Sequence, residues 1–160
     1  MSIKFVDGSV TAPKGFVASG VHCGIRKNKN KRDLALIYCE KPCTAAAIYT
    51  TNLVKSAPIL VTRANLENGT AQAVICNSGN ANTCNSDGVA VAEKTCALVA
   101  KALNIDAKDV IVGSTGVIGQ KLPIEPIANS IPELVSALSK EGATNAAEAI
   151  MTTDLVKKEY

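Results

Sequence analysis

Three evenly spaced glycines after a short apolar run are the clearest candidate for chemistry in this sequence. The segment reads Gly113-Ser114-Thr115-Gly116-Val117-Ile118-Gly119 and follows Asp109-Val110-Ile111-Val112, whose β-branched residues predict a buried strand. A helical pattern begins near Leu122. Glycine-rich backbone between a strand and a helix can point N–H groups at an anion, either a bound phosphate or the oxyanion formed during acyl transfer.

The glycine spacing excludes the two common phosphate-binding motifs. A P-loop needs four residues between its glycines and then Lys-Ser/Thr, whereas five residues separate Gly113 from Gly119 and Gln120-Lys121-Leu122 follows. The dinucleotide motif needs glycines two and then three apart, and here both intervals are three. An oxyanion hole or a structural turn remains, and the spacing alone favours the structural turn.

A second polar segment follows the strand predicted at 71–76. It carries Asn77, Asn80, Asn82 and Asn85 within nine positions. Asparagine side chains bond to nearby backbone and tolerate left-handed conformations, so these residues can build a structured loop. Their amides could equally line a polar pocket at the end of a strand, and both interpretations stay open.

The remaining pattern predicts an α/β or α+β layered domain, 1–160, with no internal boundary. Further strands are predicted at 21–25, 33–39, 44–50 and 58–62, with Lys41-Pro42 ending the second of these. A helix capped by Asp87 runs to about Asn104, with its apolar stripe at Val89, Ala92, Cys96, Val99 and Leu103. Pro132 is expected to divide 122–139 into two pieces. Capping boxes at Ser130/Glu133 and Asn145/Glu148 predict later helices, the last at 146–151.

The composition of the chain argues against nucleic-acid binding and against a structural zinc site. The chain is 47% apolar with a net charge of +3, and its basic residues thicken only at 26–32, where interleaved asparagines indicate a solvated loop rather than a nucleic-acid surface. Six cysteines without CxxC spacing and one histidine, His22, argue against a structural zinc site, and His22 is assigned a structural role. No signal peptide and no membrane span are found, which predicts a cytoplasmic protein.

Several short segments, taken together, resemble the ornithine acetyltransferases, also called glutamate N-acetyltransferases, of arginine biosynthesis. They are Pro13-Lys14-Gly15-Phe16, Asp33-Leu34-Ala35-Leu36-Ile37, Tyr49-Thr50-Thr51-Asn52, Asn77-Ser78-Gly79-Asn80-Ala81-Asn82, Ser114-Thr115-Gly116-Val117-Ile118-Gly119 and Ala149-Ile150-Met151-Thr152-Thr153-Asp154. They occur in the family's order and span nearly the whole chain. The asparagine and glycine segments together are specific, although neither alone would be.

The resemblance implies a precursor that cleaves itself before a threonine, which then becomes the nucleophile of the downstream chain. It implies a layered αββα sandwich resembling N-terminal-nucleophile folds, completed by that second chain. The acetyl group would pass from N-acetylornithine to the threonine and then to glutamate, releasing ornithine, and some members also accept acetyl-CoA. No metal or cofactor is expected. Thr115 and Gly116 would form the oxyanion hole, and Thr152, with Thr153 beside it, would contact substrate.

The family's cleavage motif is absent from this sequence. The chain is therefore interpreted as part or all of the upstream (α) product, without the nucleophile, in an assembly expected to be α2β2. Alone, it is expected to expose apolar surface and sheet edges and to be insoluble. Two alternatives remain: another self-processing hydrolase of similar fold, such as an aminopeptidase, and a non-catalytic anion-binding domain.

Overall fold

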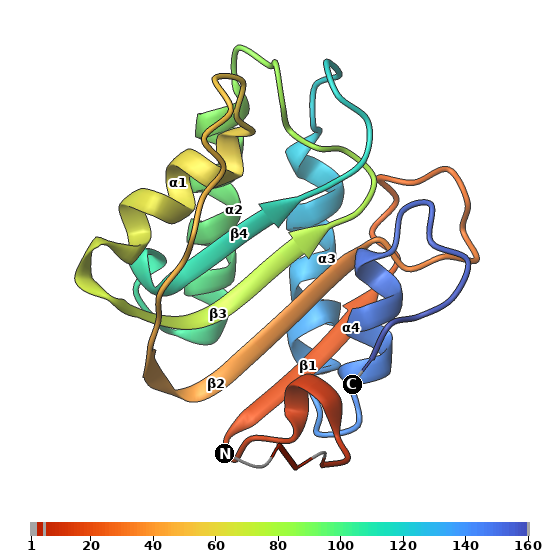
Figure 1. Ribbon diagram of the computed structural model, residues 1–160. Helices are drawn as coiled ribbons and strands as arrows, with labels where there is room; N and C mark the ends of the chain where they lie inside the picture. Colours follow the sequence, from red (N-terminus) through yellow and green to blue (C-terminus); the bar gives the residue numbers. More distant parts are fainter. Residues whose placement is uncertain (1–2, 5, 160) are drawn as a thin grey trace.

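The chain folds into a four-stranded sheet with helices on both faces (Figure 1). The computed structural model describes residues 3–4 and 6–159. The strands are β1 (Phe16–Val21), β2 (Leu34–Thr44), β3 (Thr70–Asn77) and β4 (Val110–Ser114). The helices are α1 (Ala57–Asn65), α2 (Gly88–Leu103), α3 (Ile124–Ser136) and α4 (Ala143–Ile150), with short 3-10 turns at Ser9–Thr11, Leu66–Asn68 and Ala107–Asp109. The α/β class predicted from the sequence is confirmed.

The strand directions place three connecting segments at one end of the sheet. The spatial order is β1-β2-β3-β4, with β1/β2 and β2/β3 antiparallel and β3/β4 parallel. Asn77 at the end of β3 pairs with Ser114 at the end of β4 and with Leu34 at the start of β2. The asparagine segment, the glycine segment and the loop that precedes β2 therefore meet at this end.

The two faces of the sheet bury different kinds of side chain. Leu34, Leu36 and Ile75 point toward α2 and α3 and share one core with them, and each is almost fully buried. The intervening residues point to the other face, where Ala18 and Ala35 pack against Ala146 and Ala149 of α4. Burying one large aliphatic side chain contributes about 1.5–3 kcal/mol, so the first face supplies most of the apolar stabilisation.

Parts of both outer strands are covered, so the sheet edges are less exposed than the sequence led us to expect. The Thr62 hydroxyl of α1 donates to the Val112 carbonyl at 2.9 Å and accepts from the Val112 N–H at 3.1 Å, so it satisfies both backbone groups of Val112 at the open edge of β4. At the other edge, Ala18 and Ser139 exchange two backbone hydrogen bonds of 3.0 Å. Side chains and a short bridge thus occupy edge groups that would otherwise be free to pair with another chain.

The helix at 88–103 and the strands near 33–39, 71–76 and 109–112 are confirmed, whereas other predicted elements are wrong. Residues 58–62 lie in α1, 45–50 form no strand, since β2 ends at Thr44, and the first strand ends at Val21 rather than beginning there. Strand β2 continues through Pro42. Beyond Cys39 it pairs only with β3, after a register shift, and a proline is tolerated in a strand that has one unpaired side.

Proline and capping predictions also failed in the last third of the chain. Helix α3 runs through Pro132 without a break, and α4 begins after Gly142, so neither predicted capping box starts a helix. Asp87 does stand at the N-cap of α2, but its side chain makes no capping hydrogen bond.

Candidate active site

The glycine and asparagine segments extend the pairing of β3 and β4 beyond the sheet. The Thr115 N–H donates to the Asn77 carbonyl, the Ala81 N–H to the Val117 carbonyl and the Gly119 N–H to the Thr83 carbonyl, each at 2.9 Å. Because β3 and β4 are parallel neighbours that end in register, the two segments leave the sheet side by side. The glycine turn is therefore held by backbone along its whole length.

The asparagine amides support this pairing, which resolves the alternative left open by the sequence in favour of a structured loop. The Asn77 carboxamide accepts from the N–H groups of Gly79 and Asn80 and donates to the Ser114 hydroxyl at 2.7 Å. The Asn80 amide donates to the carbonyls of Gln120 and Lys121 beyond the glycine turn. Both asparagines are buried, and their hydrogen bonds join the two segments rather than face a ligand.

Gly116 occupies a position that no other residue fits. Its φ is +129°, and a Cβ atom there would lie 2.5 Å from the Gly79 carbonyl carbon. Among the described residues, neither the Thr115 hydroxyl nor the Gly116 N–H has a hydrogen-bond partner. The turn thus presents two adjacent donors on a fixed backbone, as an oxyanion hole requires.

All four residues predicted for the site line one cavity. Helix α4 ends at Ile150, and the segment that follows it brings Thr152 and Thr153 to the same cavity as the glycine turn. The cavity has a volume of about 730 Å³, and its lining is Ile25, Arg26, Lys27, Asn28, Ser78, Gly79, Thr115, Gly116, Val117, Gln120, Thr152 and Thr153. The structure brings these threonines together, although their roles stay predictions.

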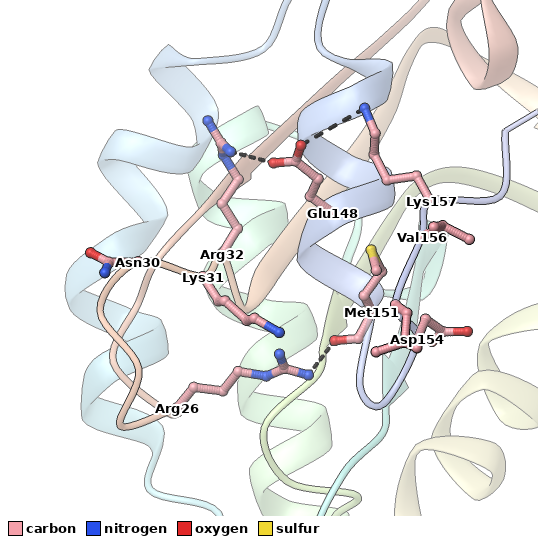
Figure 2. Close-up of a pocket in the computed structure, with 10 residues that line it drawn as sticks. Arg26, Asn30, Lys31, Arg32, Glu148, Met151, Asp154, Val156 and Lys157 are labelled. Carbon is pink, nitrogen blue, oxygen red and sulfur yellow. Dashed lines mark hydrogen bonds and ion pairs between the residues drawn. The ribbon is translucent and has the colours of Figure 1, made fainter.

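Sequence reasoning missed Arg26, which lies between this cavity and a neighbouring one of about 700 Å³. Figure 2 shows Arg26 directed at Met151, and, farther along the neighbouring cavity, Arg32 and Lys157 on either side of Glu148. The basic run predicted as a solvated loop is solvated at 27–31, but Arg26 and Arg32 are half-buried and bonded. Composition could not distinguish these two arginines from their exposed neighbours.

Three of the six cysteines are not activated, and the single histidine bonds within its own loop. Burial raises the pKa of Cys23 to about 12 and that of Cys76 and Cys96 to about 11, so these thiols stay protonated. The His22 ring lies 2.9 Å from the Lys31 carbonyl and 3.6 Å from Asp33, within its own loop. The described residues contain no metal-binding cluster and no helix that is long and apolar enough to cross a bilayer.

Comparison with known proteins settles the family. The sequence profile of the ArgJ family matches residues 17–160. This chain belongs to the ArgJ family. It is 46% identical over 157 residues to an arginine biosynthesis bifunctional protein ArgJ from Caldanaerobacter subterraneus, and 50% identical over 157 residues to one from Gloeobacter violaceus. These matches cover 98% and 97% of this chain but 38% of each relative, so the chain spans about two fifths of their length.

Solved structures of ArgJ proteins share the fold. A crystal structure from Bacillus halodurans matches with a TM-score of 0.87 and 43% identity, covering 93% of this chain and 78% of that chain. The ornithine acetyltransferase of Mycobacterium tuberculosis, solved in complex with ornithine, matches with a TM-score of 0.88 and 42% identity, covering 93% of this chain and 81% of that chain. The N-terminal-nucleophile class expected from the sequence is the class of these ArgJ structures.

Proposed function

We propose that this chain is the upstream part of an ornithine acetyltransferase that moves the acetyl group of N2-acetyl-L-ornithine to L-glutamate. The observation that carries the proposal is the shared cavity, which has two free donors at Thr115–Gly116 on one side and Thr152–Thr153 on the other. Family membership supplies the reaction class, and the M. tuberculosis relative was solved with ornithine bound.

The reaction proceeds in two acyl transfers through a threonine on the downstream chain. Its hydroxyl oxygen attacks the acetyl carbonyl carbon, and its proton passes to the departing ornithine amine. The resulting acetyl-threonine ester is attacked by the glutamate amine, which restores the hydroxyl. Each step forms a tetrahedral intermediate, and the Thr115 hydroxyl and Gly116 N–H donate to its oxyanion.

Thr152 makes a different contribution in this proposal. It contacts the bound amino acid both in the ground state and in the transition state, with Thr153 as its neighbour, so it sets KM rather than kcat. The reaction requires no metal or cofactor, and acetyl-CoA is an additional donor that the same acyl chemistry allows.

A second chain completes the enzyme. This chain spans about two fifths of its curated relatives but about four fifths of each solved chain, as expected if the relatives are cut into separate chains. Ile48, Leu53 and Leu155 are almost fully exposed, and a partner would bury such side chains. The proposed partner is the downstream β chain in an α2β2 assembly. The proposed compartment is the cytoplasm, although the rice and maize relatives are named chloroplastic.

The test is to express the full-length protein and offer it N-acetylornithine and glutamate. The expected result is N-acetylglutamate and ornithine in equal amounts, together with a second chain that begins with threonine by mass spectrometry. Hydrolysis of the acetyl donor without transfer would favour a self-processing hydrolase. Phosphate binding without either reaction would favour an anion-binding domain. Replacing N-acetylornithine by acetyl-CoA in the same assay tests whether acetyl-CoA is a second acetyl donor.

Residues 1–160 alone are expected to show no acetyl transfer, because they carry the donors without the nucleophile. They are also expected to be poorly soluble, since the apolar residues that a partner would bury remain exposed. Sedimentation and thermal melting of this fragment measure both points. A soluble, monomeric and cooperatively melting fragment would contradict the half-enzyme interpretation.

A further inference from the structure

We infer that Arg26 is a positioning residue that fixes the distance between the two sides of the active-site cavity; this inference rests on the proposed function. Its guanidinium bridges two backbone carbonyls that belong to different segments. Nε donates to the Ser78 carbonyl at 2.8 Å, and one terminal nitrogen donates to the Met151 carbonyl. Figure 2 shows the side chain extending from the basic loop to Met151.

Both acceptors belong to the cavity wall or adjoin it: Ser78 lines the cavity, and Met151 lies one residue from it. Ser78 precedes Gly79, the residue on which Gly116 rests with no room for a Cβ atom. Met151 precedes Thr152, and both Thr152 and Thr153 line the same cavity as Gly116. A planar guanidinium holds its donors at a fixed separation, so it sets the spacing between the two carbonyls more rigidly than a single-point donor can.

The backbone of Arg26 is itself held by a buried carboxylate. Asp33 is fully buried and accepts from the backbone N–H groups of Cys23 at 2.6 Å and Arg26 at 2.8 Å. The Asp33 carbonyl also accepts from the Ser78 N–H at 3.0 Å. The base of the arginine and one of its acceptors are thus tied to the same residue at the start of β2. The backbone from which the guanidinium extends is thus bonded to the residue that directly precedes β2.

Loss of this bridge loosens the chain at Thr152, because the other bonds that hold the segment, from Lys157 to Glu148 and from Thr144 to Glu159, lie farther along it. The glycine turn keeps its own backbone pairing with the asparagine segment. The substrate contact therefore loosens and the oxyanion donors stay in place. KM rises and kcat is nearly unchanged. A general loss of folding would lower the amount of active enzyme and leave the KM of the remaining molecules unchanged.

The experiment uses the full-length, self-processed enzyme and four variants: Arg26→Gln, Arg26→Lys, Thr152→Val and the double variant Arg26→Gln/Thr152→Val. We expect Arg26→Gln to raise KM for N-acetylornithine by up to about 10-fold, the loss expected when the Thr152 contact is lost, with kcat within about twofold. Arg26→Lys, which can reach only one carbonyl at a time, gives a smaller rise. Because Arg26 acts through the Thr152 segment, Arg26→Gln adds less than about twofold to KM in the Thr152→Val background.

Lys29→Gln is the matched control, because it removes a positive charge from the same loop at an exposed position that lines neither cavity. It leaves KM unchanged. An Arg26→Gln enzyme with normal KM overturns the inference. The inference is also overturned if Arg26→Gln raises KM by the same factor in the Thr152→Val enzyme as in the wild-type enzyme. If Arg26→Gln does not fold, Arg26→Lys with normal KM overturns it. Wild-type enzyme without acetyl transfer refutes the proposed function instead, so the two failures are distinguishable.

Discussion

The two sides of the active-site cavity are built by different means. The side that carries Thr115 and Gly116 continues a parallel strand pair and is reinforced by the buried Asn77 and Asn80 amides. The side that carries Thr152 is a short segment after α4. The bond from Arg26 to the Met151 carbonyl holds it next to Thr152, and the contacts of Lys157 with Glu148 and of Thr144 with Glu159 hold it farther along. A site for a short-lived oxyanion gains from rigid donors, because they need no rearrangement as charge develops. A substrate contact is less demanding, since it is already made in the ground state. Changes on the first side should therefore affect kcat and changes on the second KM.

The largest effect is expected where the rigid side is forced apart. Gly116→Ala places a methyl group 2.5 Å from the Gly79 carbonyl carbon, so the turn and both donors must move. We expect kcat to fall by more than about 10²–10³-fold, the loss typical of a single oxyanion donor. Gly119→Ala is the control: its φ is +76°, but nothing lies within 4 Å of the added Cβ. It should lose about 1–2 kcal/mol of stability to backbone strain and keep most of its kcat. Equal kcat values for the two variants would contradict the packing argument.

Removal of one donor without movement of the backbone comes next. Thr115→Ala should lower kcat about 10²–10³-fold and leave KM within a few-fold, because in the proposed reaction the hydroxyl bonds mainly to the transition state. Steady-state kinetics of the full-length enzyme measure both constants. Thr44→Ala, at an exposed threonine at the end of β2 that does not line the cavity, is the control and should match wild type. Near-normal turnover by Thr115→Ala would remove this residue from the oxyanion hole.

The rigid side was also the more predictable one from sequence. Strand 109–112, the glycine turn and strand 71–76 carry strong local patterns, and the structure has all three. The parallel pairing that brings Asn77 beside Ser114 is a long-range contact that no local pattern encodes. Because of that pairing, the asparagine amides bond to the glycine segment and the residues after it rather than to a ligand.

Elsewhere, tertiary packing outweighed local preference. Pro132 removes one hydrogen bond from α3, yet the helix continues because Ile127, Ile131 and Leu134 bury one continuous face against the sheet. Strand β1 was missed because Ala18, Ser19 and Gly20 are small or turn-forming residues, and α4 packs closely on them. Helix α1 was taken for a strand, although Pro58 in the first turn after Ser56 is typical of a helix start.

Changes on the side of the cavity that carries Thr152 should have a smaller effect, and on KM rather than on kcat. Thr152→Val keeps the shape of the side chain and removes its hydroxyl, so KM should rise about 10-fold for a lost substrate hydrogen bond while kcat is spared. Thr153→Val is the comparison, because both threonines line the cavity. A normal KM for Thr152→Val with a raised KM for Thr153→Val would transfer the role to Thr153.

The smallest effect is expected at the far end of the same segment, where Asp154 bonds to Lys158 at 2.6 Å. The hydrogen bond and charge of Lys158 lower the pKa of the Asp154 carboxyl. The pair therefore stabilises the fold fully above the ordinary aspartate pKa, and this contribution is lost as pH falls through the lowered value. Lys158→Met should return the Asp154 pKa toward its ordinary value, measurable by an NMR titration. At pH 7 it should leave KM and the melting temperature of the enzyme unchanged, because exposed ion pairs contribute little. A KM increase as large as that of Arg26→Gln would mean that the surface pair, and not the arginine bridge, holds Thr152 in place.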